Sequence, residues 1–274
     1  MPNHYKMKTL FTALALILAI PSLAQNTFLY KTAKAEVILL AEINSIRKAD
    51  NLIGFTPEIA AETAPDKTYP GGTNAFLIKT EGNNILVDTG LGRELFKNLD
   101  THGVKPEEVE VILITHLHAD HFLGLARDGE RAFPNAKIYL SQKESENIPE
   151  NAKKLIEMYK GDIVIFEPKE ESTPLIHGIS SMAAYGHTPG HTVYMVDNLM
   201  IWGDLTHAMA IQMPYPEVAI SYDSDPQMAV KSRLRILEYV TNKKLVVAGM
   251  HIPYPSIGTV TKQGDNGYLF TPAK

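Results

Sequence analysis

The sequence T-H-L-H-A-D-H at residues 115–121 directly follows the apolar run V-E-V-I-L-I at 109–114. A buried strand that ends in imidazoles and a carboxylate is costly unless something satisfies those polar groups. A bound metal ion does so, and the potential ligands are His116, His118, Asp120 and His121. The chain therefore needs a fold in which a buried strand ends at a polar, metal-binding edge.

The residue types of this run limit which metals it can hold. Imidazole and carboxylate suit Zn, Fe, Mn and similar ions, and the chain has 0 cysteines, which excludes a thiolate-rich structural zinc site. In an extended segment, His116 and His118 point to the same side and can bind one ion. Asp120 and His121 lie where the chain must turn and can reach a second ion, and paired ions typically lie about 3.5–4 Å apart. The alternative is a solvated loop.

Three later segments have the same character. G-H-T-P-G-H at 186–191 follows the strand-like 180–185, W-G-D at 202–204 follows the apolar 199–201, and G-M-H at 249–251 follows 244–248. Strand ends are where a rigid scaffold presents functional side chains. We expect these segments to converge on the 115–121 run.

This set of motifs, in this order and preceded by V-D-T-G at 87–90, resembles the metallo-β-lactamase superfamily over nearly the whole chain. The resemblance implies an α/β fold, a four-layer αβ/βα sandwich with metals at the shared edge of its two sheets. It implies that His116, His118 and His187 bind the first ion. It implies that Asp120, His121 and His251 bind the second, with Asp204 bridging the two.

Two more residues are expected to support the ligands. Asp88 would orient a ligand through a hydrogen bond, although Asp-Thr-Gly is also ordinary turn chemistry. In the resembling family the second histidine of G-H-T-P-G-H is usually not a ligand. We therefore expect His191 to have a supporting or structural role.

The implied chemistry is hydrolysis of an ester-type bond by a hydroxide that bridges two divalent ions, with Zn²⁺ expected and Fe, Mn or Co as alternatives. Asp204 favours lactonases and the methyl parathion hydrolase group over true β-lactamases, which generally lack it. The segment 202–218 is similar to that group. Asp120 could also move a proton. His207 stands where many lactonases have a tyrosine, and it is either an acid catalyst or a pocket wall.

The substrate is expected to be a small molecule: a lactone, an activated ester or a phosphotriester. Alternatives are a β-lactamase, a small-molecule phosphodiesterase and a non-catalytic metal-binding protein. The candidate substrate-binding side chains are Phe122, Met213, Tyr215 and Tyr254.

Residues 1–24 read as a secretory signal peptide, with Lys6 and Lys8, a short apolar stretch and the small residues Ser22 and Ala24. An uncleaved anchor is the alternative, whereas no membrane anchor is expected after cleavage. Residues 25–274 are expected to be a single periplasmic or secreted domain. With a net charge of −5 and no basic cluster, the chain is a poor candidate for binding nucleic acid. A homodimer is common in the resembling group.

Periodicity and turn residues predict the remaining elements. Strands are expected over 34–40, 75–79, 84–87, 137–140 and 163–166, with 75–79 and 84–87 forming a hairpin. Helices are expected over 92–99, 142–148, 151–159 and 225–240. The last helix should begin with Pro226 and bury an apolar face that includes Met228, Val230, Leu234, Ile236 and Leu237.

Overall fold

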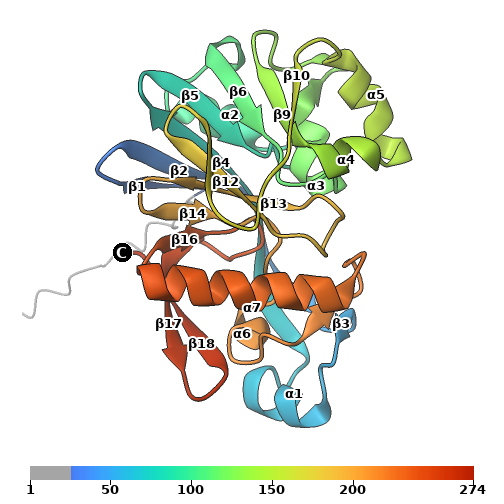
Figure 1. Cartoon of the computed structure of the whole chain (residues 1–274), viewed down its shortest axis with the longest axis vertical. Helices are drawn as coiled ribbons and strands as arrows, with labels where there is room; N and C mark the ends of the chain where they lie inside the picture. Colours follow the sequence, from blue (N-terminus) through green and yellow to red (C-terminus); the bar gives the residue numbers. More distant parts are fainter. Residues whose placement is uncertain (1–25) are drawn as a thin grey trace, which may run out of the picture.

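Two seven-stranded sheets face each other at the centre of the computed structural model, which describes residues 26–274 (Figure 1). The first sheet has the order β1 (Thr27–Lys31), β2 (Ala35–Lys48), β4 (Thr68–Thr80), β5 (Asn83–Val87), β6 (Val109–Leu113), β9 (Lys137–Ser141) and β10 (Ile163–Phe166). The second has the order β11 (Thr173–Ile176), β12 (Ile179–Ala183), β13 (Thr192–Val196), β14 (Leu199–Ile201), β16 (Val246–Ala248), β17 (Ile257–Gln263) and β18 (Gly267–Pro272). The predicted signal peptide lies outside the described residues.

Helices and short strand pairs complete the structure. The helices are α1 (Pro57–Thr63), α2 (Leu95–Thr101), α3 (Ala119–Phe122), α4 (Gln142–Glu146), α5 (Glu150–Met158), α6 (Met209–Gln212) and α7 (Pro226–Lys243), with 3₁₀ turns at Pro106–Glu108 and Leu123–Leu125. The strand pairs are β3 (Leu52–Ile53) with β15 (Ala219–Ile220), and β7 (Ala126–Arg127) with β8 (Glu130–Arg131). In the described part of the chain, no helix combines the length and apolar character needed to cross a membrane.

Three apolar layers hold the sheets and helices together. Alternation along β2 sends Val37 and Leu39 into the layer between the sheets, and Ile38 and Leu40 into the layer beneath α2 and α5. A third layer packs α7 against the outer face of the second sheet through Ile236, Leu237 and Val240. These layers confirm the predicted αβ/βα sandwich. In Figure 1, α4 and α5 lie beside β9 and β10, and α7 crosses the lower half of the molecule.

The first long strand extends further than the sequence predicted. The strand predicted over 34–40 continues to Lys48 as β2, which pairs with β4 along its length and is interrupted by a bulge at Glu42. The far part of this pair forms a two-stranded arm, 43–48 with 68–73, beyond the reach of β1. The arm was not predicted because it is rich in polar residues and glycine. Alternation of apolar and polar residues indicates a strand only where one face of that strand packs on a core.

The longest helix begins as predicted but buries a different face. Asp225 caps α7 by accepting a hydrogen bond from the Met228 backbone nitrogen, and Pro226 occupies its first turn. Met228 and Leu234, predicted as buried, are each 40% exposed. Arg233 is buried in their place, where it donates hydrogen bonds to backbone carbonyls of the 205–218 segment. The buried face of α7 therefore includes a charged residue, Arg233, whose side chain holds the 205–218 segment in place.

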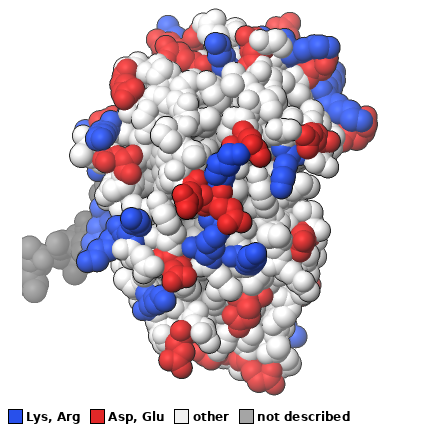
Figure 2. Space-filling model, in the orientation of Figure 1, with Lys and Arg blue, Asp and Glu red and all other residues white. Residues whose placement is uncertain are grey.

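Surface charge is mixed on the face seen in Figure 2. Lysine and arginine side chains alternate there with aspartate and glutamate. This face therefore carries no extended basic area of the kind that follows a nucleic-acid backbone.

Candidate metal centre

The T-H-L-H segment is fixed by a carboxylate at the end of the neighbouring strand. β5 and β6 are parallel neighbours, so Asp88 and Thr115, which follow them, meet at one sheet edge. Asp88 accepts hydrogen bonds from the Thr115 backbone nitrogen at 2.7 Å and from its Oγ1 at 2.6 Å. The Asp88 backbone has a φ of 58°, a left-handed conformation that aspartate tolerates better than most residues.

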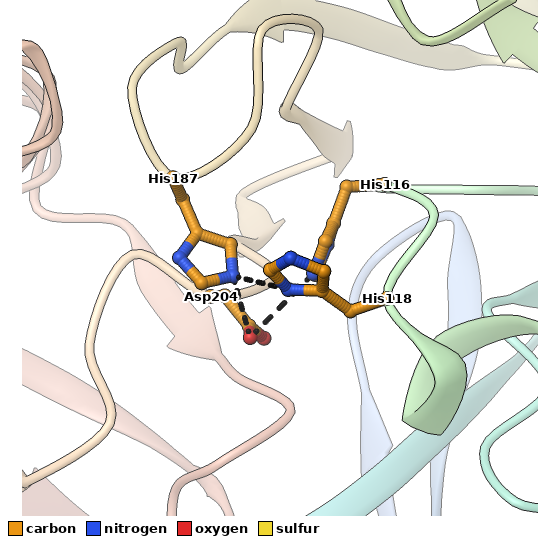
Figure 3. Close-up of side chains that lie close together, drawn as sticks. All are labelled: His116, His118, His187 and Asp204. Atoms are coloured by element: carbon orange, nitrogen blue, oxygen red, sulfur yellow. Dashed lines mark hydrogen bonds and ion pairs between the residues drawn. The ribbon is translucent and has the colours of Figure 1, made fainter. Parts of the chain in front are cut away.

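The first group of candidate ligands comes from both sheets. Donor atoms of His116, His118, His187 and Asp204 all lie within 4.8 Å of one another (Figure 3). The Nδ1 atom of His118 is 2.9 Å from Nε2 of His187, which is 3.2 Å from Oδ2 of Asp204. The three imidazole rings come from two segments 69 residues apart in sequence, yet their nitrogens point to one place, as the ligands of one ion do.

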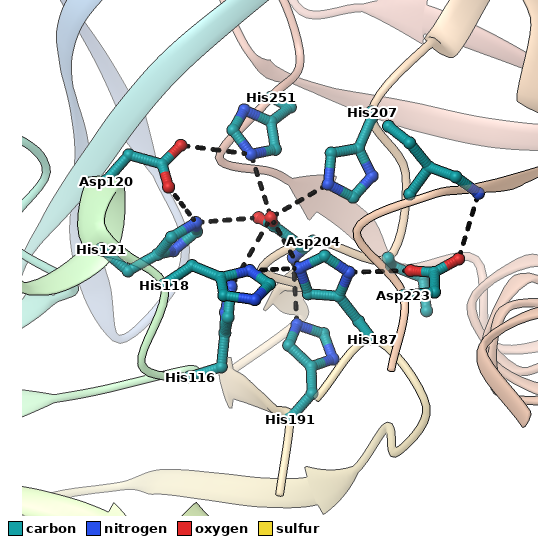
Figure 4. Close-up of polar contacts among 12 residues, drawn as sticks. His116, His118, Asp120, His121, His187, His191, Asp204, His207, Asp223 and His251 are labelled. Atoms are coloured by element: carbon teal, nitrogen blue, oxygen red, sulfur yellow. Dashed lines mark hydrogen bonds and ion pairs between the residues drawn. The ribbon is translucent and has the colours of Figure 1, made fainter. Parts of the chain in front are cut away.

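The second group shares the Asp204 carboxylate. Asp120, His121 and His251 place one donor atom each within the same 4.8 Å limit. Nε2 of His121 lies 3.2 Å from Oδ1 of Asp204, and Nε2 of His251 lies 3.0 Å from Oδ2. Figure 4 shows the Asp204 carboxylate at the centre, with the imidazoles directed at it from several sides. Asp204 is therefore positioned to contact both groups.

The chemistry of these groups fits divalent metal ions. Among the described residues, His116 Nε2, His121 Nε2 and Asp204 Oδ1 are buried without a hydrogen-bond partner. Leaving such atoms unsatisfied would cost about 1–3 kcal/mol each. Metal coordination satisfies all three, so the residues present suit the metals that the donor types favour.

Burial and neighbouring carboxylates together set the charge states of the rings. It lowers the pKa of His118 to about 4 and that of His191 and His207 to about 3, which keeps these imidazoles neutral. Burial also lowers the pKa of His187, but hydrogen bonds to two carboxylates outweigh it and raise the value to about 8. Neutral imidazole is the metal-binding form, so a metal would have to displace a proton from His187.

Hydrogen bonds behind the rings fix which nitrogen points inward. Nδ1 of His121 is 2.6 Å from Oδ2 of Asp88, and Nδ1 of His187 is 2.8 Å from Oδ1 of Asp223. A carboxylate at Nδ1 holds the proton there and leaves Nε2 free to bind a metal. Asp223 was not identified from the sequence. Its signal was the S-Y-D-S-D-P segment, where Asp225 alone was recognised, as the start of a helix.

His191 supports Asp204 through the backbone. Its Nδ1 donates to the Ala184 carbonyl oxygen at 3.0 Å, and its Nε2 accepts from the Asp204 backbone nitrogen at 3.0 Å. Both nitrogens are thus engaged away from the metal groups. Gly203 makes this approach possible, because a side chain there would collide with the His191 ring.

A buried glutamate, also missed by the sequence reasoning, ties together the two loops that carry the first group. Glu144 on α4 is 2% exposed. It accepts from the Leu117 nitrogen at 3.0 Å, from the Gly190 nitrogen at 2.9 Å and from the Thr188 hydroxyl. The Q-K-E-S-E segment is typical of a solvated helix, so nothing in the local sequence indicated that Glu144 would be buried.

A cavity of about 430 Å³ opens beside the metal groups. Its walls include Arg47, His118, Asp120, His207, Tyr222 and His251. Arg47 and Tyr222 were not among the predicted pocket residues. Tyr222 is 58% exposed, and its ring centroid lies 6.4 Å from that of His207.

The structure places none of the four predicted substrate-binding side chains in the wall of this cavity. Phe122 is fully buried in the layer beneath α2 and α5, because successive helical residues point in different directions. Met213 is buried in the layer under α7. Tyr215 lines a separate cavity and donates its hydroxyl to Glu62. Tyr254 packs edge-on against Phe28.

His207 does line the cavity. Its Nε2 lies 3.1 Å from Oδ2 of Asp204, and its ring stacks on that of His251 at 4.7 Å between centroids. The Gln212 side chain accepts hydrogen bonds from the His207 and Ala208 nitrogens at 2.7 and 2.9 Å and so fixes this turn.

Solved structures of other proteins share the fold. The solved structure of hydrolase AbOPH of the beta lactamase superfamily is 26% identical, with a TM-score of 0.81 over 91% of this chain and 98% of that one. The solved structure of AidC, a dizinc quorum-quenching lactonase, is 23% identical, with a TM-score of 0.78 over the same shares of 91% and 98%.

A shorter match joins the chain to a nuclease. The exodeoxyribonuclease WalJ of Streptococcus pneumoniae is 36% identical over 104 residues, 34% of this chain and 39% of that protein. The chain thus spans well under half the length of this curated relative. The model of the metallo-beta-lactamase superfamily matches residues 68–251, which include every histidine and carboxylate of the two metal groups. The chain belongs to the metallo-beta-lactamase superfamily.

Proposed function

We propose that this protein is an exported hydrolase that binds two divalent metal ions and cleaves lactones or activated esters. The observation that carries the proposal is the position of Asp204, whose carboxylate lies between two groups of inward-facing ligands on the wall of a cavity. A single carboxylate at that position can bind two ions at once. The fold shared with a dizinc lactonase supports this assignment.

In the proposed assignment, His116, His118 and His187 would hold the first ion. Asp120, His121 and His251 would hold the second, and Asp204 would contribute to both sites. When bound, two such ions would lower the pKa of a coordinated water and polarise the substrate carbonyl. Zn²⁺ is the ion we propose, with Fe, Mn and Co as the alternatives that the same ligands accept.

Two side chains are assigned roles beside the metals. Asp120 lines the cavity, with Oδ2 at 3.6 Å from Nε2 of His251, and could take up a proton as the ester bond breaks. His207 lines the same wall, with Nε2 at 3.1 Å from Oδ2 of Asp204. Because burial keeps its ring neutral, we assign it hydrogen-bond donation to the leaving oxygen.

Phosphodiester hydrolysis is the second candidate, because the chain also matches an exodeoxyribonuclease. That match covers 34% of this chain. We rank it below lactone and ester hydrolysis, and β-lactam hydrolysis below both.

The test combines metal analysis with a substrate panel. Purified protein would be analysed for metal content and assayed with a homoserine lactone, dihydrocoumarin, an aryl phosphotriester, bis-nitrophenyl phosphate, a thioester and nitrocefin. We expect two ions per chain and fastest turnover of a lactone or aryl ester, abolished by His116→Ala but retained by His102→Ala. Preference for the phosphodiester or nitrocefin would contradict the proposal.

Export is a separate part of the proposal. We expect the mature chain to begin after Ala24 and to be found in the periplasm or outside the cell. Cell fractionation and the intact mass of the recovered protein would test this, and a full-length chain in the cytoplasm would contradict it.

A further inference from the structure

Two adjoining cavities lie beside the metal centre. The first, of about 430 Å³, contains Asp204 and His251 in its wall. The second, of about 330 Å³, is lined by Lys48, Asp50, Asn51, Tyr69 and Ile220. Arg47, His207 and Tyr222 line both. A substrate whose scissile bond lies at the metals would therefore place its next group against these shared residues.

Arg47 is held at this junction by the two-stranded arm. Its NH2 group donates to the Gly72 carbonyl oxygen and, at 3.0 Å, to Oγ1 of Thr73. Both acceptors belong to β4, which pairs with β2 at this point. These bonds fix the guanidinium without using all of its donors, since arginine carries five N–H groups.

The remaining Arg47 donors have no strong acceptor in the described structure. NH1 lies 3.4 Å from Nδ1 of His251, but that nitrogen is 2.9 Å from the Gly72 carbonyl oxygen and must donate its proton there. It therefore cannot accept from Arg47. Among the ion pairs within 4.0 Å found in residues 26–274, none joins Arg47 to a carboxylate.

The charges around the junction favour an anion. Lys48 and Asp50 both line the second cavity and offset each other, so the Arg47 guanidinium is the net positive charge at the junction. Asp120 shares the first cavity, but its carboxylate is committed to the metal groups. Apolar lining is sparse in the second cavity, where Ile220 is the one aliphatic wall among tyrosines and polar residues. A long hydrocarbon chain would gain little there.

We propose that Arg47 binds an anionic group of the substrate, so that the preferred substrates are lactones or esters carrying a carboxylate near the scissile bond. This rests on the proposed hydrolase function and names its substrate class. A planar guanidinium pairs with a carboxylate through two parallel hydrogen bonds. A phosphonate shares this chemistry, and the experiment separates the two.

The test compares matched substrates on the metal-loaded protein. Nitrophenyl esters of pentanoic acid, of glutaric acid, which adds a carboxylate, and of the corresponding phosphonate would be assayed for kcat/KM. The wild type should prefer the glutarate ester over the neutral one. Arg47→Met should reduce that preference about 10- to 100-fold, mainly through KM, with a much smaller effect on the neutral ester. Arg47→Lys should recover part of it, and Lys34→Met, a distant cation exchange, should change nothing.

Other outcomes overturn the inference in distinguishable ways. Equal loss on charged and neutral esters, with loss of bound metal, would show that Arg47 only supports Gly72 and His251. A preference for the phosphonate ester over the carboxylate ester would show that Arg47 selects a phosphonate and would overturn the carboxylate assignment. If the wild type hydrolyses no ester, the proposed function fails. Calorimetric titration of the metal-loaded protein with glutarate then decides the inference: binding unaffected by Arg47→Met refutes it, and binding weakened tenfold supports it.

Discussion

The Nδ1 atom of His121 lies 2.6 Å from Oδ2 of Asp88, and both side chains are completely buried. The same carboxylate accepts two hydrogen bonds from Thr115. Burial by itself raises the pKa of Asp88, and the His121 charge acts against that effect. One buried carboxylate thus sets both the position of the T-H-L-H segment and the orientation of a ring that faces Asp204.

Replacing this carboxylate should weaken the second metal group. Asp88→Asn can turn an amide N–H toward Nδ1, which would move the imidazole proton to Nε2, where the metal should bind. We expect metal affinity at one of the two sites to fall about 10- to 100-fold. Competition with a chromophoric chelator measures this. Asp128→Asn, whose side chain is 95% exposed, is the matched control; equal affinities in both variants would refute the role.

The corresponding change on the first group is Asp223→Asn. It removes the carboxylate that lies 2.8 Å from Nδ1 of His187. The expected loss is also about 10- to 100-fold, but at the other ion. Titration with Co²⁺ followed by absorption should show two binding phases, with a different phase weakened in each Asp→Asn variant. Asp265→Asn, at an exposed position, should leave both phases intact.

Glu144→Ala should destabilise the protein as a whole. The substitution leaves buried donors of Leu117, Thr188 and Gly190 without their acceptor. The expected loss is about 2–4 kcal/mol of unfolding free energy, measured by urea denaturation of the metal-loaded protein. Glu146→Ala on the exposed side of the same helix should cost under about 0.5 kcal/mol. Similar losses in the two variants would show that Glu144 does not tie the loops together.

Metal removal should lower thermal stability. Without metal, the buried ligand atoms His116 Nε2, His121 Nε2 and Asp204 Oδ1 have no hydrogen-bond partner. A ligand at about 100 times its Kd stabilises the native state by about 2.7 kcal/mol. Calorimetry before and after chelation should therefore show a lower Tm that Zn²⁺ restores and Mg²⁺ does not. A Tm independent of zinc would argue against the site.

His207 can be tested by the basicity of the leaving group. His207→Leu removes the Nε2 donor and keeps an apolar wall of similar size. Lactone hydrolysis, which expels a basic alkoxide, should lose about 100-fold in kcat. A nitrophenyl ester, whose leaving group needs little help, should lose only a few-fold. An equal effect on both substrates would indicate that His207 is a pocket wall.

Local patterns in the sequence were enough for much of the scaffold. The β10 strand was predicted with its observed ends, and Pro226 was placed correctly in the first turn of α7. The hairpin of β4 and β5 was also predicted. Each depends on neighbours in the chain, where alternation, capping and turn chemistry act directly. The β2–β4 arm has no such local signal, since its pairing forms between segments far apart in sequence.

The sequence was enough to select the histidines and aspartates that the structure brings together in the two metal groups, because their motifs follow apolar strands in the order of a known family. Tertiary structure decided which side chains support the metal groups and which line the cavity beside them. Glu144 and Asp223 act through side chains delivered from α4 and from the segment before α7. Arg47 reaches the cavity from the arm, while Phe122, adjacent to His121 in sequence, turns into the core. Sequence neighbours share chemistry only if the backbone points them the same way, and packing of distant elements sets that direction.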